Sequence, residues 1–306
     1  MEKILVKTHE DELISYYTKL NLDHTSPSQE SMLDSDWLIK YCFFTQEERR
    51  LMNINYRMTA GVTVGRASQR YVSKYMYDAD KKILNEKKDL DQIIKDEIKE
   101  YEKYQPHNEL DAEQHQETKQ YLADMIKMTV TAIKDLKLDD ESASERYCHQ
   151  YFKGLVLPKI GRIDYEDRKS IIELKTKHRS KRKTNTKQGF SWVKGYIPKE
   201  PDPIHVKQVA FYSHSTSKTP HLLYVNQDSF QVFTPDNCEM LKPDYLKFCV
   251  TEDYKKAKVR QNIVQLAKGN VQDMARLIPP PDFSSYIYKD LQMEYITKAA
   301  TLWDKV

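Results

Sequence analysis

Apolar residues recur at helical spacing through much of the first 140 residues. They follow a helical period from Val64 to Leu84, and mixed apolar and charged residues continue it over 89–104. The run Gln105-Pro106-His107-Asn108 interrupts the pattern, and a further long helix is expected over about 111–137. The front part of the chain is therefore predicted to be helical, and its last two long helices could form an antiparallel pair.

The pattern changes near Ser142, where residues typical of strands become frequent. Three strands, one helix, two strands and closing helices are expected, at 145–153, 155–165, 170–176, 205–215, 221–226, 229–234, 239–268 and 284–304. The polar residues 166–169 read as a turn between the second and third strands, and Gln227-Asp228 as the turn of a hairpin. This order predicts an α/β fold, with a mixed sheet flanked by helices and a helical lobe in front of it.

We expect residues 1–141 to form the helical lobe, including a first core helix at about 64–84. Residues 142–306 would form the core together with the C-terminal helices. The length of 306 residues is sufficient for a sizeable core, and we expect both parts to pack as one compact unit.

Composition narrows the class of protein. Of all residues 39% are hydrophobic and 31% charged, and no apolar run approaches the roughly 20 residues of a membrane span. The acidic start of the chain does not resemble a signal or transit peptide, so we expect a cytoplasmic protein without a membrane partner. The four cysteines are far apart and form no C-x-x-C pair, which predicts neither a zinc ribbon nor an iron–sulfur cluster.

The candidate chemistry centres on Asp164, Glu173 and Lys175. Glu173 and Lys175 are two apart on an expected strand, so their side chains leave the same face. The turn at 166–169 would fold this strand back and bring Asp164 beside Glu173. Two adjacent carboxylates share a proton or bind a cation, and Mg²⁺ prefers such oxygen ligands. A lysine next to them could stabilise charge on a phosphorus centre, although Glu-x-Lys alone is common on surface strands.

Gln208 and Tyr212 are four apart on an expected helix and share one of its faces. Glutamine can orient a water or a lysine, and tyrosine can contact a phosphate or a base. The alternative is an ordinary helix with Gln208 in solvent and Tyr212 at the edge of the core.

The charge distribution points to a polyanion as partner. The chain has 49 basic and 46 acidic residues, but residues 175–187 contain seven Lys or Arg and no acid. A basic loop directly after the candidate strand would hold a nucleic-acid backbone, and nearby aromatic groups could stack on bases; a solvated surface loop is the alternative. The DNA-binding candidates here are Lys177, Arg179, Lys181, Arg182, Lys183 and the aromatic Trp192.

Three short motifs, taken in order, resemble those of RecB-like nucleases of the PD-(D/E)XK superfamily. That family has G-h-h-D, then (D/E)-h-K, then Q-h-x-x-Y, where h is apolar. This chain has G-R-I-D at 161–164, E-L-K-T at 173–176 and Q-V-A-F-Y at 208–212, with Arg162 in an apolar place. The resemblance covers roughly 64–234 and is nearest to phage exonucleases.

The resemblance implies a PD-(D/E)XK core and a DNA exonuclease that hydrolyses phosphodiester bonds. Asp164, Glu173 and the backbone carbonyl of Leu174 would hold Mg²⁺, for which Mn²⁺ could substitute. Lys175 would be the catalytic lysine, and Gln208 and Tyr212 would line the active site. A phage enzyme of this kind would act in DNA degradation or recombination in the host cytoplasm, where a recombination or replication protein could be its partner.

One position departs from the family pattern. The first family motif is a helical G-x-x-x-H whose His can bind the metal, whereas this chain has Gly65 followed by Gln69. An amide oxygen can coordinate Mg²⁺, so Gln69 would be a neutral ligand or would orient a water, unless it lies on the solvent side. Arg66 and Arg70 on the same helix could contact phosphate.

Two other classes of function stay open from the sequence. One is a non-catalytic or structure-specific DNA-binding or recombination module on the same fold. The other is a helical interaction protein, which the acidic front half favours. The intact set of Asp164, Glu173 and Lys175 favours the nuclease.

Overall fold

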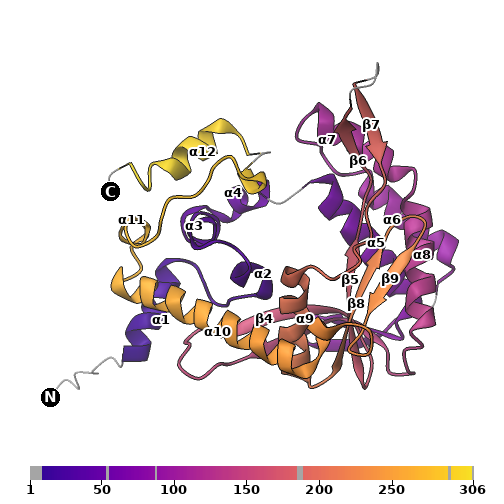
Figure 1. Ribbon diagram of the computed structural model, residues 1–306, viewed down its shortest axis with the longest axis horizontal. Helices are drawn as coiled ribbons and strands as arrows, with labels where there is room; N and C mark the ends of the chain where they lie inside the picture. The colour runs from indigo at the N-terminus through magenta and orange to yellow at the C-terminus, as the bar shows by residue number, and fades with distance from the viewer. Residues whose placement is uncertain (1–8, 53–54, 87, 185–188, 289–290, 305–306) are drawn as a thin grey trace. The chain divides into compact units, whose positions relative to one another are not determined.

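The computed structural model describes residues 9–52, 55–86, 88–184, 189–288 and 291–304 (Figure 1). The chain divides into two compact units. The terminal unit combines residues 1–53, 149–161 and 250–306, and the sheet unit combines 54–148 and 162–249. The expected boundary near residue 141 coincides with neither unit, because the helices at the two ends of the chain pack with each other.

The terminal unit is built from helices. They are α1 (His9–Lys19), α2 (Pro27–Glu30), α3 (Asp34–Trp37), the π-helical η1 (Leu38–Phe43), α4 (Gln46–Leu51), α10 (Pro243–Leu266, which begins in the sheet unit), α11 (Val271–Ala275), η3 (Tyr286–Tyr288) and α12 (Met293–Ala300). Trp37, Leu38 and Ile39 pack in its core with Tyr288 and Leu302. Residues from both ends of the chain therefore share one hydrophobic core.

A seven-stranded mixed sheet with the order β2-β1-β3-β4-β5-β8-β9 organises the other unit. Its strands are β1 (Tyr75–Asp78), β2 (Lys81–Leu84), β3 (Ala143–Gln150), β4 (Lys159–Glu166), β5 (Ser170–Thr176), β8 (Thr219–Val225) and β9 (Phe230–Phe233). Its helices are α5 (Tyr56–Val72), α6 (Leu90–Tyr101), α7 (Glu109–Lys119), α8 (Leu122–Asp135), α9 (Pro203–Thr216) and the short η2 (Glu239–Leu241). The expected α/β class, with a mixed sheet flanked by helices, is confirmed.

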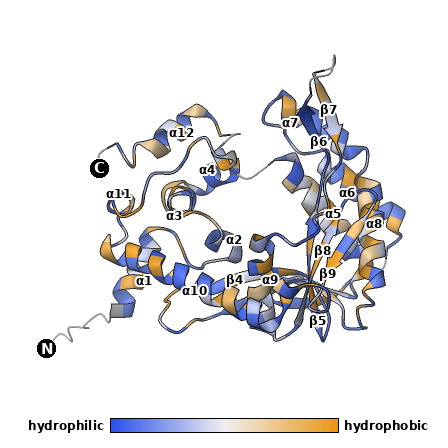
Figure 2. Ribbon diagram, viewed as in Figure 1, coloured by the Kyte–Doolittle hydropathy of each residue, from blue (hydrophilic) through white to orange (hydrophobic). Residues whose placement is uncertain are grey.

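The two faces of the sheet are covered by different helices (Figure 1). Tyr165, Ile172 and Leu223 point to one face, where they pack against Ala132 and Ile133 of α8. Helix α9 contacts β5 and β8. Because strand side chains alternate between faces, Glu173 and Lys175 lie opposite Ile172 and face α9. Figure 2 shows apolar residues along β8 and α8, which agrees with the burial of most of β8.

The first core helix differs from the expectation of 64–84. Helix α5 begins earlier, at Tyr56, where the Asn55 side chain caps it by accepting from Met58 N, and it ends at Val72. The apolar residues that follow form the β1–β2 hairpin, with β1 parallel to β3. Tyr75 and Tyr77 favour strands, and the spacing of this segment fitted a helix only because the pattern was short.

Two further expectations need correction. The helix expected over 111–137 is two helices, α7 and α8, which are separated at Gln120-Tyr121. The basic segment expected as an irregular loop contains a hairpin of β6 (Ser180–Lys183) and β7 (Phe190–Val193), which form a separate two-stranded sheet. Among the described residues, none of the helices combines the length and the apolar character that crossing a bilayer requires.

Candidate functional site

The site begins at the hairpin that joins β4 to β5. Its turn is held by Asp167, whose Oδ1 accepts from the backbone N–H groups of Lys169 at 2.8 Å and Ser170 at 2.7 Å. The two strands are antiparallel, with Glu166 opposite Ile171 and Tyr165 opposite Ile172. This register brings Asp164 beside Glu173, as the sequence predicts.

Asp164 lies where the backbone pairing of β4 and β5 ends. There its side chain, instead of a backbone carbonyl, accepts a hydrogen bond from the neighbouring strand. Its Oδ2 accepts from the Leu174 backbone N–H at 2.8 Å. This bond fixes the carboxylate between the strands and uses the N–H of Leu174. The expected role of the Leu174 carbonyl stays a prediction.

Lys175 connects the strand to helix α9. Its Nζ donates to Glu173 Oε1 at 2.7 Å and to Gln208 Oε1 at 2.8 Å. The amide Nε2 of Gln208 in turn donates to the Tyr212 hydroxyl at 2.9 Å. Tyr212 is buried and Gln208 half-buried, so the alternative with Gln208 in solvent is wrong. Glu173, Lys175, Gln208 and Tyr212 therefore form one connected group, and Asp164 adjoins it through its bond to the Leu174 backbone.

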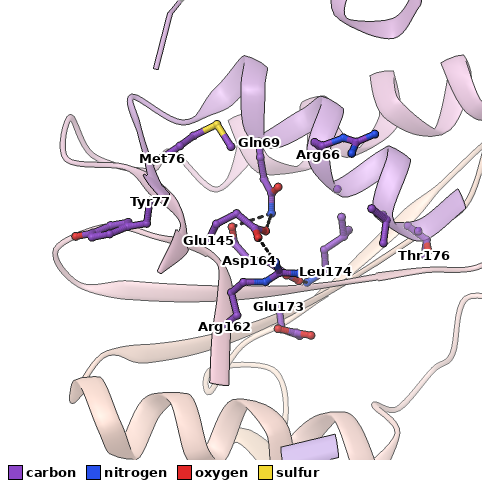
Figure 3. A pocket seen from close by; sticks show the side chains of 13 residues that line it. Arg66, Gln69, Met76, Tyr77, Glu145, Arg162, Asp164, Glu173, Leu174 and Thr176 are labelled. Atoms are coloured by element: carbon purple, nitrogen blue, oxygen red, sulfur yellow. Dashed lines mark hydrogen bonds and ion pairs between the residues drawn. The ribbon is translucent and has the colours of Figure 1, made fainter. Parts of the chain in front are cut away.

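Asp164 and Glu173 border a cavity of about 500 Å³ within the sheet unit (Figure 3). Asp164, Glu173 and Leu174 contribute to its floor, and Gln69 reaches into it from α5. Thr176 lies toward one end and Tyr77 toward the other (Figure 3). The cavity will be called the carboxylate cavity.

Gln69 points into this cavity, but in a way that differs from the expectation. Only 4% of the residue is exposed, so a position on the solvent side is wrong. Its amide Nε2 donates to Glu145 Oε1 at 2.6 Å and to the Asp164 carbonyl at 3.3 Å (Figure 3). The structure thus turns the amide nitrogen toward Glu145, which makes Gln69 a positioning residue for that carboxylate.

Glu145 is the residue that the sequence reading missed. It lies on β3 with φ of 66°, in the left-handed region that a glutamate rarely adopts. Its second oxygen pairs with Arg162 at 2.9 Å. Backbone strain of this kind persists where other contacts enforce it and clusters at functional sites. The strand pattern of 145–153 did not indicate a site residue, because the unusual backbone conformation is what directs the Glu145 side chain to the cavity.

Electrostatics within the site disfavour ionised Asp164. Burial raises its pKa well above the usual value, and the charge of Glu173 raises it further, while Lys175 and the Leu174 N–H oppose the shift. The Tyr212 pKa is also raised, first by burial and then by the charge of Glu173. Burial and the neighbouring Glu173 therefore both disfavour the charged form of Asp164, which is a condition that a cation would relieve.

The residues that could hold a divalent cation here are Asp164 and Glu173. Glu173 is 4% exposed, and within the described part of the chain its Oε2 has no hydrogen-bond partner, since Lys175 occupies Oε1. No three His, Cys, Asp or Glu side chains among the described residues form a ligand cluster. A cation would accordingly rest on Asp164 and Glu173 with water and substrate oxygens, which is a mode that suits Mg²⁺.

The basic residues that we expect to bind DNA form more ion pairs within the protein than the sequence suggested. Arg66 and Arg70 both bind Glu97, at 2.5 Å and 2.6 Å, and Glu97 is buried. Their first role is thus to neutralise Glu97, although Arg66 also borders the carboxylate cavity.

The basic segment after β5 has partners on α7. Arg179 pairs with Glu117 at 2.6 Å, and Lys181 pairs with Glu113. Lys177 lies over the Tyr224 ring, and Trp192 is opposite Lys181 in the β6–β7 hairpin. Arg182 and Lys183 are exposed, whereas 185–188 lie outside the described residues. Only part of the basic charge of this segment therefore faces solvent.

Comparisons with known proteins give no family. No protein-family model matches the chain, and no curated protein matches it. Among solved structures, the crystal structure of SSO0001 matches with 16% sequence identity, over 53% of this chain and 82% of that chain, at a TM-score of 0.25. A similarity at this level carries no argument about fold family or function.

Proposed function

We propose that the chain is a magnesium-dependent deoxyribonuclease that hydrolyses phosphodiester bonds, and that it follows the plan of RecB-like exonucleases. The observation that carries the proposal is the bonded group of Glu173, Lys175, Gln208 and Tyr212, with Asp164 next to it and the two carboxylates at the carboxylate cavity. These residues come from two strands and one helix, and along the chain they follow the order of the nuclease motifs.

Each side chain has a role in this proposal. Asp164 and Glu173 would hold Mg²⁺, which when bound polarises a phosphate and lowers the pKa of water. Lys175 has three N–H donors, of which Glu173 and Gln208 accept two. The third can donate to a phosphate oxygen or to the attacking water. Gln208 and Tyr212 keep the ammonium in place, and Gln69 with Arg162 positions Glu145 at the cavity wall.

The test is digestion of 5′- and 3′-labelled single- and double-stranded DNA, with Mg²⁺ or with a chelator. Cleavage should require the metal and should be lost in Asp164→Asn, Glu173→Gln and Lys175→Met. Glu200→Gln is the matched control, because it removes one exposed carboxylate of the same unit that borders neither the group nor the cavity. Wild-type turnover in any of the three site variants would remove that residue from the proposal.

Circular substrates separate an exonuclease from the alternatives. An exonuclease should degrade linear DNA and leave closed circles intact, whereas an endonuclease should cut both. Salt-dependent DNA binding without cleavage, under every metal condition, would point instead to a non-catalytic DNA-binding module. If the protein neither binds nor cleaves DNA, the helical interaction protein is the remaining alternative.

A further inference from the structure

A second cavity of about 530 Å³ lies next to the carboxylate cavity in the sheet unit. It will be called the basic cavity. Arg57, Lys177, Arg182 and Lys194 border it, together with His178 and Tyr196. Thr176 borders both cavities, so the two are neighbours along β5. Its lining among the described residues includes four cationic side chains and no carboxylate, which distinguishes it from its neighbour.

The positive charge here is little compensated. Among the described residues, Lys194 is the one of the four with an ion pair, to Asp228 at 2.7 Å. Arg57 donates its Nε to the neutral Tyr56 hydroxyl at 2.8 Å. Burial lowers the pKa of Lys177, Asp202 opposes this shift, and the charges of Lys175 and Arg57 add to it. Like charges therefore crowd together, and a bound anion would relieve their repulsion.

His178 supplies a polar group that needs a partner. It is 9% exposed, and within the described part of the chain its Nδ1 is buried without a hydrogen bond, while Nε2 lies 3.0 Å from the Thr176 hydroxyl. Burial, with Arg57 and Lys177 nearby, lowers its pKa to about 3, so the ring is neutral at pH 7. When Thr176 donates to Nε2, Nδ1 carries the proton and can donate to an anion.

The wall of the basic cavity is fixed by a close backbone approach. A Cβ on Gly195 would lie 2.2 Å from the Lys177 carbonyl oxygen, so this position requires glycine. The buried Asn226 side chain donates to the Gly195 carbonyl at 2.8 Å, and Lys177 N donates to Val225 O at 2.8 Å. The backbone at Lys177 and Gly195 is thus held in place, which favours binding of a small, compact anion.

We propose that the basic cavity binds the terminal phosphate of a nucleic-acid strand whose scissile bond lies in the carboxylate cavity. A terminal monoester carries about −1.5 to −2 charges at pH 7, which suits four cations better than the single charge of a backbone diester. Tyr196, which is 67% exposed at the rim, can stack on the terminal base. The inference rests on the proposed function, because it takes nucleic acid as the substrate.

The two cavities are separated by a short length of strand. Glu173 and Lys177 are four residues apart, which corresponds to about 13 Å of extended chain. That length matches the rise of about four nucleotides of a duplex strand. An end held in the basic cavity would therefore place a bond a few nucleotides inward at the carboxylates, and the first product should be a short oligonucleotide.

The experiment measures binding without cleavage. Fluorescent oligonucleotides of one sequence, with a 5′-phosphate, a 3′-phosphate or hydroxyls at both ends, are titrated with the full chain in a chelator. One phosphorylated end should bind about tenfold more tightly than the hydroxyl form, equal to about 1.4 kcal/mol. The phosphorylated end that binds more tightly, 5′ or 3′, identifies which terminal phosphate the basic cavity takes. Affinities within twofold for all three would overturn the proposal.

Variants link the preference to the cavity. Arg57 and Arg182 are exposed, so Arg57→Gln and Arg182→Gln should fold, and together they should reduce the preference to near one. Lys199→Gln is the control, since it removes one exposed positive charge of the same unit that does not border the cavity. A preference that persists in the double variant contradicts the assignment to this cavity.

Glu173→Gln separates this inference from the nuclease proposal. The variant should lose cleavage but keep the preference for a phosphorylated end, because Glu173 does not border the basic cavity. If wild-type protein shows the binding preference without metal-dependent cleavage, the nuclease proposal fails alone. If it cleaves DNA without regard to the end group, the basic cavity inference fails alone.

Discussion

At the scale of single residues, the site is defined by carboxylates held in unfavourable surroundings. Asp164 and Glu173 meet where two strands diverge, and Glu145 enters the same cavity from a backbone conformation that glutamate rarely adopts. Each arrangement costs folding free energy, and each is kept by specific bonds from Leu174, Lys175 and Gln69. Groups that destabilise a fold and converge on one cavity are typical of functional sites.

Asp164→Asn should stabilise the metal-free protein. The folded-state pKa of Asp164 is raised, so between the two pKa values the unfolded chain binds fewer protons and stability falls as pH rises through the folded value. Asparagine removes this loss, and its oxygen can still accept from Leu174 N. We expect a gain of about 1 kcal/mol at pH 8 and little gain at pH 4.

Thermal melting in a chelator measures this effect, and added Mg²⁺ should then stabilise the wild type but not the variant. The Glu200→Gln control should melt like the wild type at both pH values. Equal stability of Asp164→Asn and wild type at pH 8 would mean that Asp164 is not under electrostatic stress.

Gln69→Ala should act through Glu145. Without the amide, Glu145 Oε1 and the Asp164 carbonyl lose a donor, and the carboxylate is less well positioned. Loss of such a supporting contact commonly lowers metal affinity or activity about 10–100-fold. Titration of Mg²⁺ against both cleavage and melting temperature should show a higher half-maximal concentration than in wild type. Superimposable curves would place Gln69 outside the machinery.

At the scale of elements, helix α7 neutralises part of the basic segment. Glu117 of α7 pairs with Arg179, which directly precedes strand β6. Glu113 of the same helix pairs with Lys181, which lies on the strand. Both acids lie on one helix face four residues apart, so a single element neutralises two of the candidate DNA-binding side chains. In Figure 2 the short strand β6 is strongly hydrophilic, as expected for a solvated or phosphate-binding surface.

Removing those acids should strengthen DNA binding. In Glu113→Gln with Glu117→Gln, Arg179 and Lys181 become available to phosphates. Each additional phosphate contact with duplex DNA adds about 0.9 to the slope of log affinity against log salt, so the slope should steepen by up to about 1.8. Affinities measured at several salt concentrations test this, with Glu200→Gln as control. An unchanged slope would show that neither cation reaches the backbone.

At the scale of the whole molecule, each unit carries its own buried charges. In the terminal unit, Lys159 and Asp253 are 5% and 4% exposed and pair at 2.9 Å. Arg260, also buried, donates to Asp34 Oδ1 at 2.8 Å and to the carbonyls of Gln29 and Met32. Such groups connect segments that are more than 90 residues apart in sequence and specify which helices meet.

Breaking the buried pair should destabilise the terminal unit strongly. Asp253→Leu leaves the Lys159 charge buried without its carboxylate, which typically costs about 3–5 kcal/mol. The double variant with Lys159→Met should recover much of that loss, because both charges are then absent. Denaturant unfolding of the two single variants and the double variant measures the coupling. Additive losses would mean that the two side chains do not depend on each other.

The sequence by itself determined which residues of the candidate site lie together. Alternation along 170–176 placed Glu173 and Lys175 on one face, the polar turn at 166–169 brought Asp164 beside them, and helical spacing aligned Gln208 with Tyr212. These relations are local, or depend on a single hairpin, so periodicity and turn chemistry are sufficient to find them.

Only the tertiary structure decided the surroundings of those residues. The end of α5 at Val72, the strained Glu145 and the pairing of Arg66 and Arg70 with Glu97 all depend on partners distant in sequence. The amide orientation of Gln69 is set by Glu145, which is 76 residues away. The basic cavity exists because the chain returns at Gly195 onto the Lys177 carbonyl. Long-range packing overrides local propensity, and a single sequence carries no direct record of it.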